Sequence, residues 1–438
     1  MKYVLRLGSL GFVFLSCGLA WLINISALAA EPALLWPEAI QETERNNPEL
    51  KSAAMNLAAS QAEALASRAG RLPVITTAFT STVSANDLKK VQSSASGGLN
   101  SGHPTENHSV ALTATETIFD GFLNSARMRL AQAKVQEAEL IISSLKSRLS
   151  FELKSTYAAM LVAQKFLRLY EDILRRRQEN LNLVELRFAG GRENKGAALL
   201  SEAYLKQARF EELQLKNSLA VTRAKLNRIL GRTDTSRYVL KGELPLAAAP
   251  GIVDYASLAQ HTPEYQLTLN RQAQADVNLS LVRAGFYPTL GLRGSVGRQG
   301  PEFFPANDQW SISLVLTIPI FNGGSDYYAN EAAIAKLTAA GLNRENIRSD
   351  QLSKLQQAHA GFLEASEKLK VDESFQAAVS LRAEIARSKY NNGLSSFDDW
   401  DLIENDLISR QKNVLSSQRD RVIAEATWEE SQGRGVLP

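Results

Sequence analysis

Four segments of the chain alternate between apolar and polar residues, which is the pattern of half-buried β-strands. In residues 309–319, Trp310, Ile312 and Leu314 point one way, and the serines between them point the other way. We predict two pairs of strands, listed here in chain order: 73–84, 108–118, 288–298 and 309–319. Each is close to the roughly 9–11 residues of a tilted transmembrane strand. A small antiparallel sheet on a soluble core would give the same alternation.

Very long helices follow each strand pair, at 122–189 and 324–390. The 68 residues of 122–189 contain no proline or glycine, and a helix of that length would span roughly 100 Å. Large apolar residues recur there at strict seven-residue spacing, which predicts helices packed in a left-handed supercoil. They are Leu153, Met160, Leu167, Leu174, Leu181 and Phe188. The second heptad position is mixed and includes Arg177, so the pattern is not that of a simple zipper, although an ordinary long coiled coil would share it.

The same order of elements occurs twice along the chain. A helix at 38–70 or 254–285 precedes each strand pair, and a helix at 196–230 or 397–431 follows each long helix. Short landmarks recur at offsets of 215 and 202 residues. They are Asn47-Pro48-Glu49-Leu50 with Thr262-Pro263-Glu264-Tyr265, Arg68-Ala69-Gly70 with Arg283-Ala284-Gly285, and Ile118-Phe119-Asp120-Gly121 with Ile320-Phe321-Asn322-Gly323. We therefore predict two structural repeats, at 31–245 and 246–438.

The first 30 residues have the features of a secretory signal peptide. Lys2 and Arg6 precede an apolar stretch, and Ala27-Leu28-Ala29 forms an A-x-A cleavage site. Cleavage after Ala29 or Ala30 would leave a mature chain without cysteine. An uncleaved anchor helix and a lipoprotein processed at Cys17 are the alternatives.

Composition removes several classes of function. Lys and Arg number 49 against 46 for Asp and Glu, so the net charge of +3 gives no sign of nucleic-acid binding. The single cysteine excludes a disulfide framework or a cysteine-metal cluster. The four histidines do not cluster, and no P-loop, HExxH or nucleophile elbow is present. We expect no enzyme activity, no cofactor and no metal site.

Four membrane-length strands cannot close a barrel alone, because an open strand edge in lipid leaves backbone groups without partners. Bacterial barrels begin at about eight strands. If the strands lie in a membrane, the chain must therefore oligomerise. The long helices are too polar to cross lipid, and a barrel that continues into a helical tube would be a conduit.

The duplicated landmarks resemble those of the outer-membrane efflux protein family, the TolC-like channel-tunnels. The resemblance rests on the repeated segments above, on Pro73 at the entry to a strand, and on Tyr390-x-x-Gly393 with Asp399. It covers essentially the whole mature chain. It implies a mainly α fold with a β-barrel part, in which a homotrimer forms a twelve-stranded barrel and a periplasmic coiled-coil tunnel.

The resemblance also implies a passive channel in the outer membrane of a Gram-negative bacterium. A periplasmic adaptor and an inner-membrane pump of the RND or ABC type would drive substrate through it. Efflux of drugs or metals is the first expectation, and the exit duct of a type I protein secretion system is the alternative. From a different class, a soluble periplasmic coiled-coil scaffold stays open. The loops 84–107 and 300–308 would face outside, and the turns 190–196 and 391–397 would be the periplasmic tips.

Two sets of residues follow from the resemblance, and a third follows from the aromatic residues near the predicted strands. Tyr390 matches a gate tyrosine and Asp399 an acid that constricts the tunnel, with Asp398 and Asp401 beside them; Ser396 with Asp399 also fits a helix capping box. Ser395 and Ala197 depart from the family pattern, which can place an arginine and an acid there. Adaptor contacts are expected at Gly190, Gly191, Arg192, Glu193, Lys195 and Gly393. Membrane-interface aromatics are expected at Phe286, Tyr287, Phe303, Phe304 and Trp310.

Overall fold

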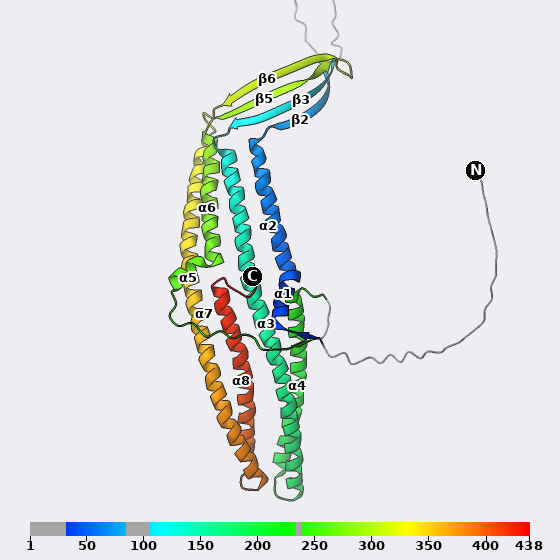
Figure 1. Ribbon diagram of the computed structural model, residues 1–438, viewed down its shortest axis with the longest axis vertical. Coiled ribbons are helices and arrows are strands. Elements are labelled where there is room, and N and C mark those ends of the chain that lie inside the picture. Colours follow the sequence, from blue (N-terminus) through cyan, green and yellow to red (C-terminus); the bar gives the residue numbers. More distant parts are fainter. Residues whose placement is uncertain (1–31, 85–104, 234–237) are drawn as a thin grey trace, which may run out of the picture.

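The computed structural model describes residues 32–84, 105–233 and 238–438. A curved β-sheet lies at one end of an elongated column of helices, and two turns lie at the opposite end (Figure 1). The predicted signal peptide and its cleavage site lie outside the described residues, as does most of the predicted loop 84–107.

The sheet is antiparallel and has four strands in the order β2-β3-β5-β6. These strands are β2 (Val74–Ser84), β3 (Thr105–Phe119), β5 (Thr289–Gly300) and β6 (Asn307–Thr317). The register of β3 against β5 shifts between Thr117 and Phe119. Because β2 and β6 each pair on one side only, the sheet ends in two open edges.

Two helices of 67 residues each, α3 (Leu123–Ala189) and α7 (Ser325–Asn391), run from the sheet to the far end of the column. There the chain reverses, and α4 (Lys195–Leu230) and α8 (Phe397–Ser431) return beside them as hairpins. Gly191 and Gly393 adopt positive φ values of +66° and +74° at these turns. We call the turns 190–194 and 392–396 the first and second tips.

The helices predicted at 38–70 and 254–285 are each broken, so that prediction was wrong. The first divides into α1 (Trp36–Asn46), α2 (Pro48–Ala66) and a 3₁₀ turn (Ser67–Arg71). The second divides into α5 (Tyr255–His261), α6 (Pro263–Arg283) and a 3₁₀ turn (Ala284–Phe286). The cause is proline, which disfavours the helical conformation of the residue before it. That residue then serves as the N-cap of the next helix.

The breaks allow short helices to stack end to end. Asn47 Nδ2 donates a hydrogen bond of 2.9 Å to the carbonyl of Ile229 in the last turn of α4, while its Oδ1 caps α2. At the end of α8, Gly433 approaches Pro263 so closely that a Cβ would lie 2.0 Å from the ring Cδ. Consequently α4 continues the line of α2, and α8 continues the line of α6 (Figure 1).

Four helices therefore lie side by side at every level of the column. Near the sheet the order of contacting helices is α2, α3, α6, α7, and near the tips it is α4, α3, α8, α7. Midway, Leu153, Tyr157 and Met160 of α3 pack in a buried cluster with Trp36 and Leu226. The cluster also includes a short parallel pairing of β1 (Ala33–Leu34) with β4 (Val239–Leu240).

Candidate functional site

The two faces of the sheet differ sharply in polarity. Strand register collects large apolar side chains on one face, and all of them are exposed in the single chain. They are Ile75, Phe79, Val83, Val110, Leu112, Leu292, Val296, Trp310, Ile312, Leu314 and Leu316. The opposite face carries mainly threonine, serine, asparagine, glutamine and glycine. An exposed apolar face of this extent marks contact with a membrane or another protein.

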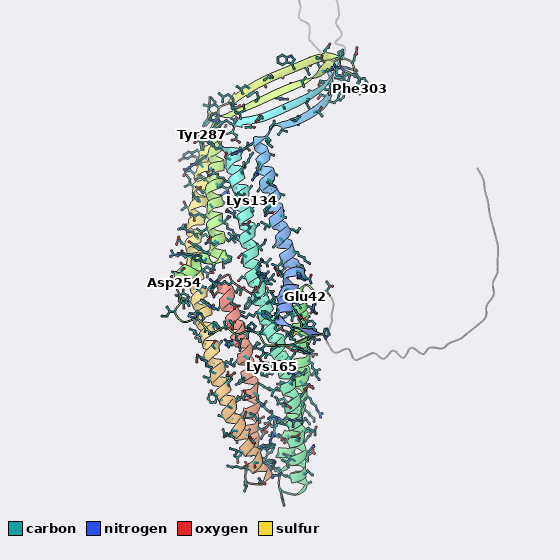
Figure 2. All side chains as sticks on the ribbon, in the orientation of Figure 1. Glu42, Lys134, Lys165, Asp254, Tyr287 and Phe303 are labelled. Carbon is teal, nitrogen blue, oxygen red and sulfur yellow. The ribbon has the colours of Figure 1, made fainter. Side chains whose placement is uncertain are left out.

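The aromatic residues expected at a membrane interface lie at the two ends of this sheet. Figure 2 shows Tyr287 where the sheet meets the helices and Phe303 at the distal end. Phe303 packs against Phe79 at 5.6 Å between ring centroids and against Phe304 at 5.2 Å. Phe286 is exposed beside Tyr287, whereas Trp310 is exposed on the apolar face three residues from the start of β6.

The second tip is held by a buried aromatic cluster around Tyr390. The Tyr390 ring stacks on Trp400 at 4.5 Å with an interplanar angle of 2° and meets Phe397 edge-on. The Arg187 guanidinium lies 4.2 Å above the same ring. The Tyr390 hydroxyl donates a hydrogen bond of 3.3 Å to Glu193, and burial together with the Glu193 charge raises the pKa of this hydroxyl. Tyr390 thus joins the end of α7 to the start of α8 and to the first tip.

Arg187 ties the two tips together directly. Its guanidinium donates hydrogen bonds to the backbone carbonyls of Tyr390, at 2.5 Å, and Asn391, at 3.2 Å. These carbonyls lie in the last turn of α7, where the helix dipole favours a cation. Of the expected adaptor contacts, Arg192, Lys195 and the glycines 190, 191 and 393 are exposed, whereas Glu193 is half-buried.

The three acids at the start of α8 have different surroundings. Ser396 donates to the Asp399 carboxylate at 2.6 Å and accepts from the Asp399 backbone N–H at 3.1 Å, which is the geometry of a cap. Asp398 and Asp399 are exposed. Asp401 is buried, and its carboxylate pairs with Arg177 at 3.4 Å. Burial raises the pKa of Asp401, and Arg177 opposes that rise.

A buried ionic cluster that we did not predict joins the two hairpins above the tips. Arg176 of α3 pairs with Glu404 of α8 at 2.7 Å, and Arg387 of α7 approaches the same carboxylate at 3.3 Å. Glu404 is only 1% exposed. Burial lowers the pKa of Arg176 despite its pairing with Glu404. The nearest sequence signal was the adjacent Arg177 at a heptad core position, because a buried cation requires an anionic partner. Arg177 itself pairs with Asp401.

No group of three or more histidine, cysteine, aspartate or glutamate side chains within 32–84, 105–233 and 238–438 is arranged to hold a metal ion. In the same part of the chain, no helix has the length and apolar character needed to cross a membrane.

Comparison with known proteins shows which proteins this chain is similar to. The family model for outer membrane efflux proteins matches the chain twice, at residues 39–232 and 256–434. The solvent efflux pump outer membrane protein SrpC of Pseudomonas putida is 22% identical over 309 residues, which are 67% of this chain and 63% of SrpC. The antibiotic efflux pump outer membrane protein ArpC, also of Pseudomonas putida, is 22% identical over 430 residues, 92% of this chain and 84% of ArpC.

Solved structures share the fold over nearly the whole chain. The outer membrane protein VceC of Vibrio cholerae superposes with a TM-score of 0.80 at 19% identity, covering 91% of this chain and 96% of VceC. The matching fold is the TolC-like one, with long coiled helices and a terminal sheet. The two matches of the family model together span most of the chain, and the chain therefore belongs to the outer membrane efflux protein family.

Proposed function

We propose that this protein is one protomer of a trimeric channel-tunnel that gives solutes a passive exit across the outer membrane of a Gram-negative bacterium. The observation that carries the proposal is the sheet, which has an exposed apolar face, a polar face and two open edges. It lies at the end of a helical column built on two 67-residue helices, each about 100 Å long.

Lipid is the environment that suits the apolar face. A side chain such as Ile312, 73% exposed in the single chain, gains by leaving water. The open edges of β2 and β6 would be costly in lipid unless they pair with another copy, because hydrocarbon offers no hydrogen bonds to backbone groups. The apolar face thus supports membrane insertion, and the edges support assembly.

The outermost strands and helices line up along two sides of the chain, from the sheet to the tips. One side presents β2, then α2, then α4, and the other presents β6 and α7. A single head-to-tail contact, repeated around an axis, would pair these two sides and close a ring. With four strands from each copy, three copies would give the twelve-stranded barrel that the family resemblance implies.

The tips are the proposed site for the periplasmic adaptor. They lie at the end of the column opposite the sheet (Figure 1) and expose Arg192, and Lys195 is exposed beside them at the start of α4. The exposed acids Asp398 and Asp399 would form a ring of carboxylates at the tunnel entrance if three copies surround an axis, and such rings favour cations. Tyr390 would hold this entrance through its contacts with Trp400 and Arg187.

An inner-membrane pump would supply the driving force and choose the cargo. The names of SrpC and ArpC refer to solvent and antibiotic efflux, which supports small-molecule efflux as the function of this chain. The two separate matches of the family model support a division into repeats at 31–245 and 246–438.

Photo-crosslinking in cells tests the assignment of the tips. A photoreactive residue at Arg192 should capture a periplasmic adaptor, whereas one at Lys134, exposed on α3 near the sheet (Figure 2), should not. Capture of the adaptor from Lys134 alone would invert the proposed orientation. Recovery of the chain as a soluble protein after alkaline carbonate treatment would favour the periplasmic scaffold instead.

A further inference from the structure

The polar face of the sheet carries one charged residue among the strand residues that the structure describes, and that residue is Arg293 of β5. Its neighbours across the strands are Thr115 of β3 and Ser313 of β6. The remaining positions of this face are serine, threonine, asparagine, glutamine, glycine, alanine or valine. A nearly uncharged surface therefore has a single cation on it.

Arg293 has no ion-pair partner in the described part of the chain, and its side chain is exposed. The backbone carbonyl of Arg293 accepts a hydrogen bond of 3.5 Å from the Ser313 hydroxyl, and this bond does not involve the guanidinium. The nearby acid Glu116 is paired in register with Leu292, so Glu116 lies on the other face of the sheet. The guanidinium charge is thus directed away from every described carboxylate on the strands.

The second arginine of the strand provides a contrast. Arg298 lies on the apolar face near the distal end, and its guanidinium forms a 2.8 Å ion pair with Asp308. An arginine that stabilises the sheet through local pairing would resemble Arg298. Arg293 lacks such a partner. Neutral residues such as serine and threonine occupy the neighbouring positions of the polar face, so the sheet itself does not require a cation there.

We infer that Arg293 forms a cationic ring in the lumen of the barrel and raises the local concentration of anionic groups at that level of the conduit. This inference rests on the proposed trimer, in which the apolar face meets lipid and the polar face lines the lumen. Arginine suits such a role because its planar guanidinium binds carboxylate or phosphate groups through two hydrogen bonds.

The size of the barrel allows three guanidinium groups to influence its whole cross-section. Twelve strands spaced by about 4.8 Å and tilted by about 40° enclose a barrel with a backbone radius of about 12 Å. Each arginine extends inward from that wall, so the axis lies within about one Debye length, which is about 8 Å at physiological salt. In water, the screened Coulomb energy between one guanidinium and a monovalent ion at the axis is then about a third of RT. Three guanidinium groups together change the local concentration of that ion about 2- to 3-fold.

Ion selectivity of the reconstituted channel tests this inference. The purified full chain is inserted into planar bilayers, and the reversal potential is measured across a KCl gradient. Arg293→Gln should raise the ratio of K⁺ to Cl⁻ permeability at least about 2-fold, and Arg293→Glu should raise it further. Arg293→Lys should retain the selectivity of the unaltered channel. Arg298→Gln is the matched control and should leave the ratio unchanged.

The possible outcomes separate this inference from the proposed function. Channels that conduct with the same permeability ratio in Arg293→Gln, Arg293→Glu and the unaltered chain would overturn the lumenal ring and leave the channel intact. Absence of any conductance from the unaltered chain would instead contradict the proposed function. If Arg293→Gln does not assemble, an unchanged ratio in Arg293→Glu or a changed ratio in Arg293→Lys overturns the ring equally well.

Discussion

The buried pair between Arg176 and Glu404 should be a principal link between the two helical hairpins. Glu404 of α8 accepts hydrogen bonds from Arg176 of α3 at 2.7 Å and from Arg387 of α7 at 3.3 Å. Arg176 also donates to Gln411 at 3.0 Å. We expect Glu404→Gln, which keeps the shape of the side chain and removes its charge, to leave the Arg176 guanidinium buried without an anion.

Removing one partner of a buried ion pair costs roughly 3–5 kcal/mol. Glutamine still offers Arg176 an acceptor oxygen, so we expect a loss near the lower bound, about 3 kcal/mol. In hydrogen exchange, that loss corresponds to about 100-fold faster exchange of amides protected by local opening of α8 and α3. The helices near the sheet should exchange at their original rates.

The matched control is an exposed ion pair on the same helical column. Glu367 and Lys370 of α7 pair at 2.7 Å, but both side chains are 69% exposed. Glu367→Gln should change local stability by less than about 1 kcal/mol, because water screens an exposed pair. Equal exchange rates in Glu404→Gln and Glu367→Gln would refute the reasoning that the buried pair joins the hairpins.

Three further predictions concern single side chains. Trp400→Ala should destabilise the second tip by about 3–5 kcal/mol, since Trp400 is 2% exposed and stacks on Tyr390. Hydrogen exchange of the amides at the tip measures this loss. Leu402→Ala is the control and should have little effect, because Leu402 is exposed. Gly433→Ala should lower the thermal unfolding midpoint more than Gly191→Ala. Both glycines have positive φ, which costs alanine about 1–2 kcal/mol, but only Gly433 also faces Pro263; equal midpoints would be inconsistent with end-to-end stacking. Asp372→Asn should destabilise the protein at neutral pH, because hydrogen bonds from Lys368 and Ser417 lower the pKa of Asp372. A carboxyl whose pKa is lowered by folding stabilises the fold at pH values above its pKa in the unfolded chain, which is near 3.8. That contribution is lost as the pH falls through the pKa of the folded state. Acid unfolding curves of the variant and the unaltered chain should therefore differ above that value and converge below the folded pKa, and a constant difference at all pH values would contradict the assignment.

Periodicity predicted much of the architecture because the elements are long and their apolar positions regular. Leu153 and Met160, expected at heptad core positions, are fully buried. The pattern was less informative near the tips, where Phe188 is 43% exposed. The helix breaks at Asn47 and Thr262 escaped the prediction because helix-forming segments flank each of them, although Pro48 and Pro263 were visible signals.

The candidate site was less accessible from the sequence, since its contacts join residues far apart in the chain. Arg176 and Glu404 are separated by 228 positions, and no local pattern relates them. The same holds for Arg187, which reaches the carbonyl of Tyr390 across 203 positions. Alternation did place Trp310 and Ile312 on one face, but assigning Arg293 to the opposite face required the strand register.

Native mass spectrometry of the chain extracted from outer membranes in mild detergent tests the central claim most directly. The open edges at β2 and β6, with the exposed apolar face between them, predict association with further copies. The proposed twelve-stranded barrel, with four strands from each copy, predicts a complex of three. The trimer should also persist in lipid nanodiscs. A stable single copy in detergent and in nanodiscs would contradict the closed barrel, and with it the channel.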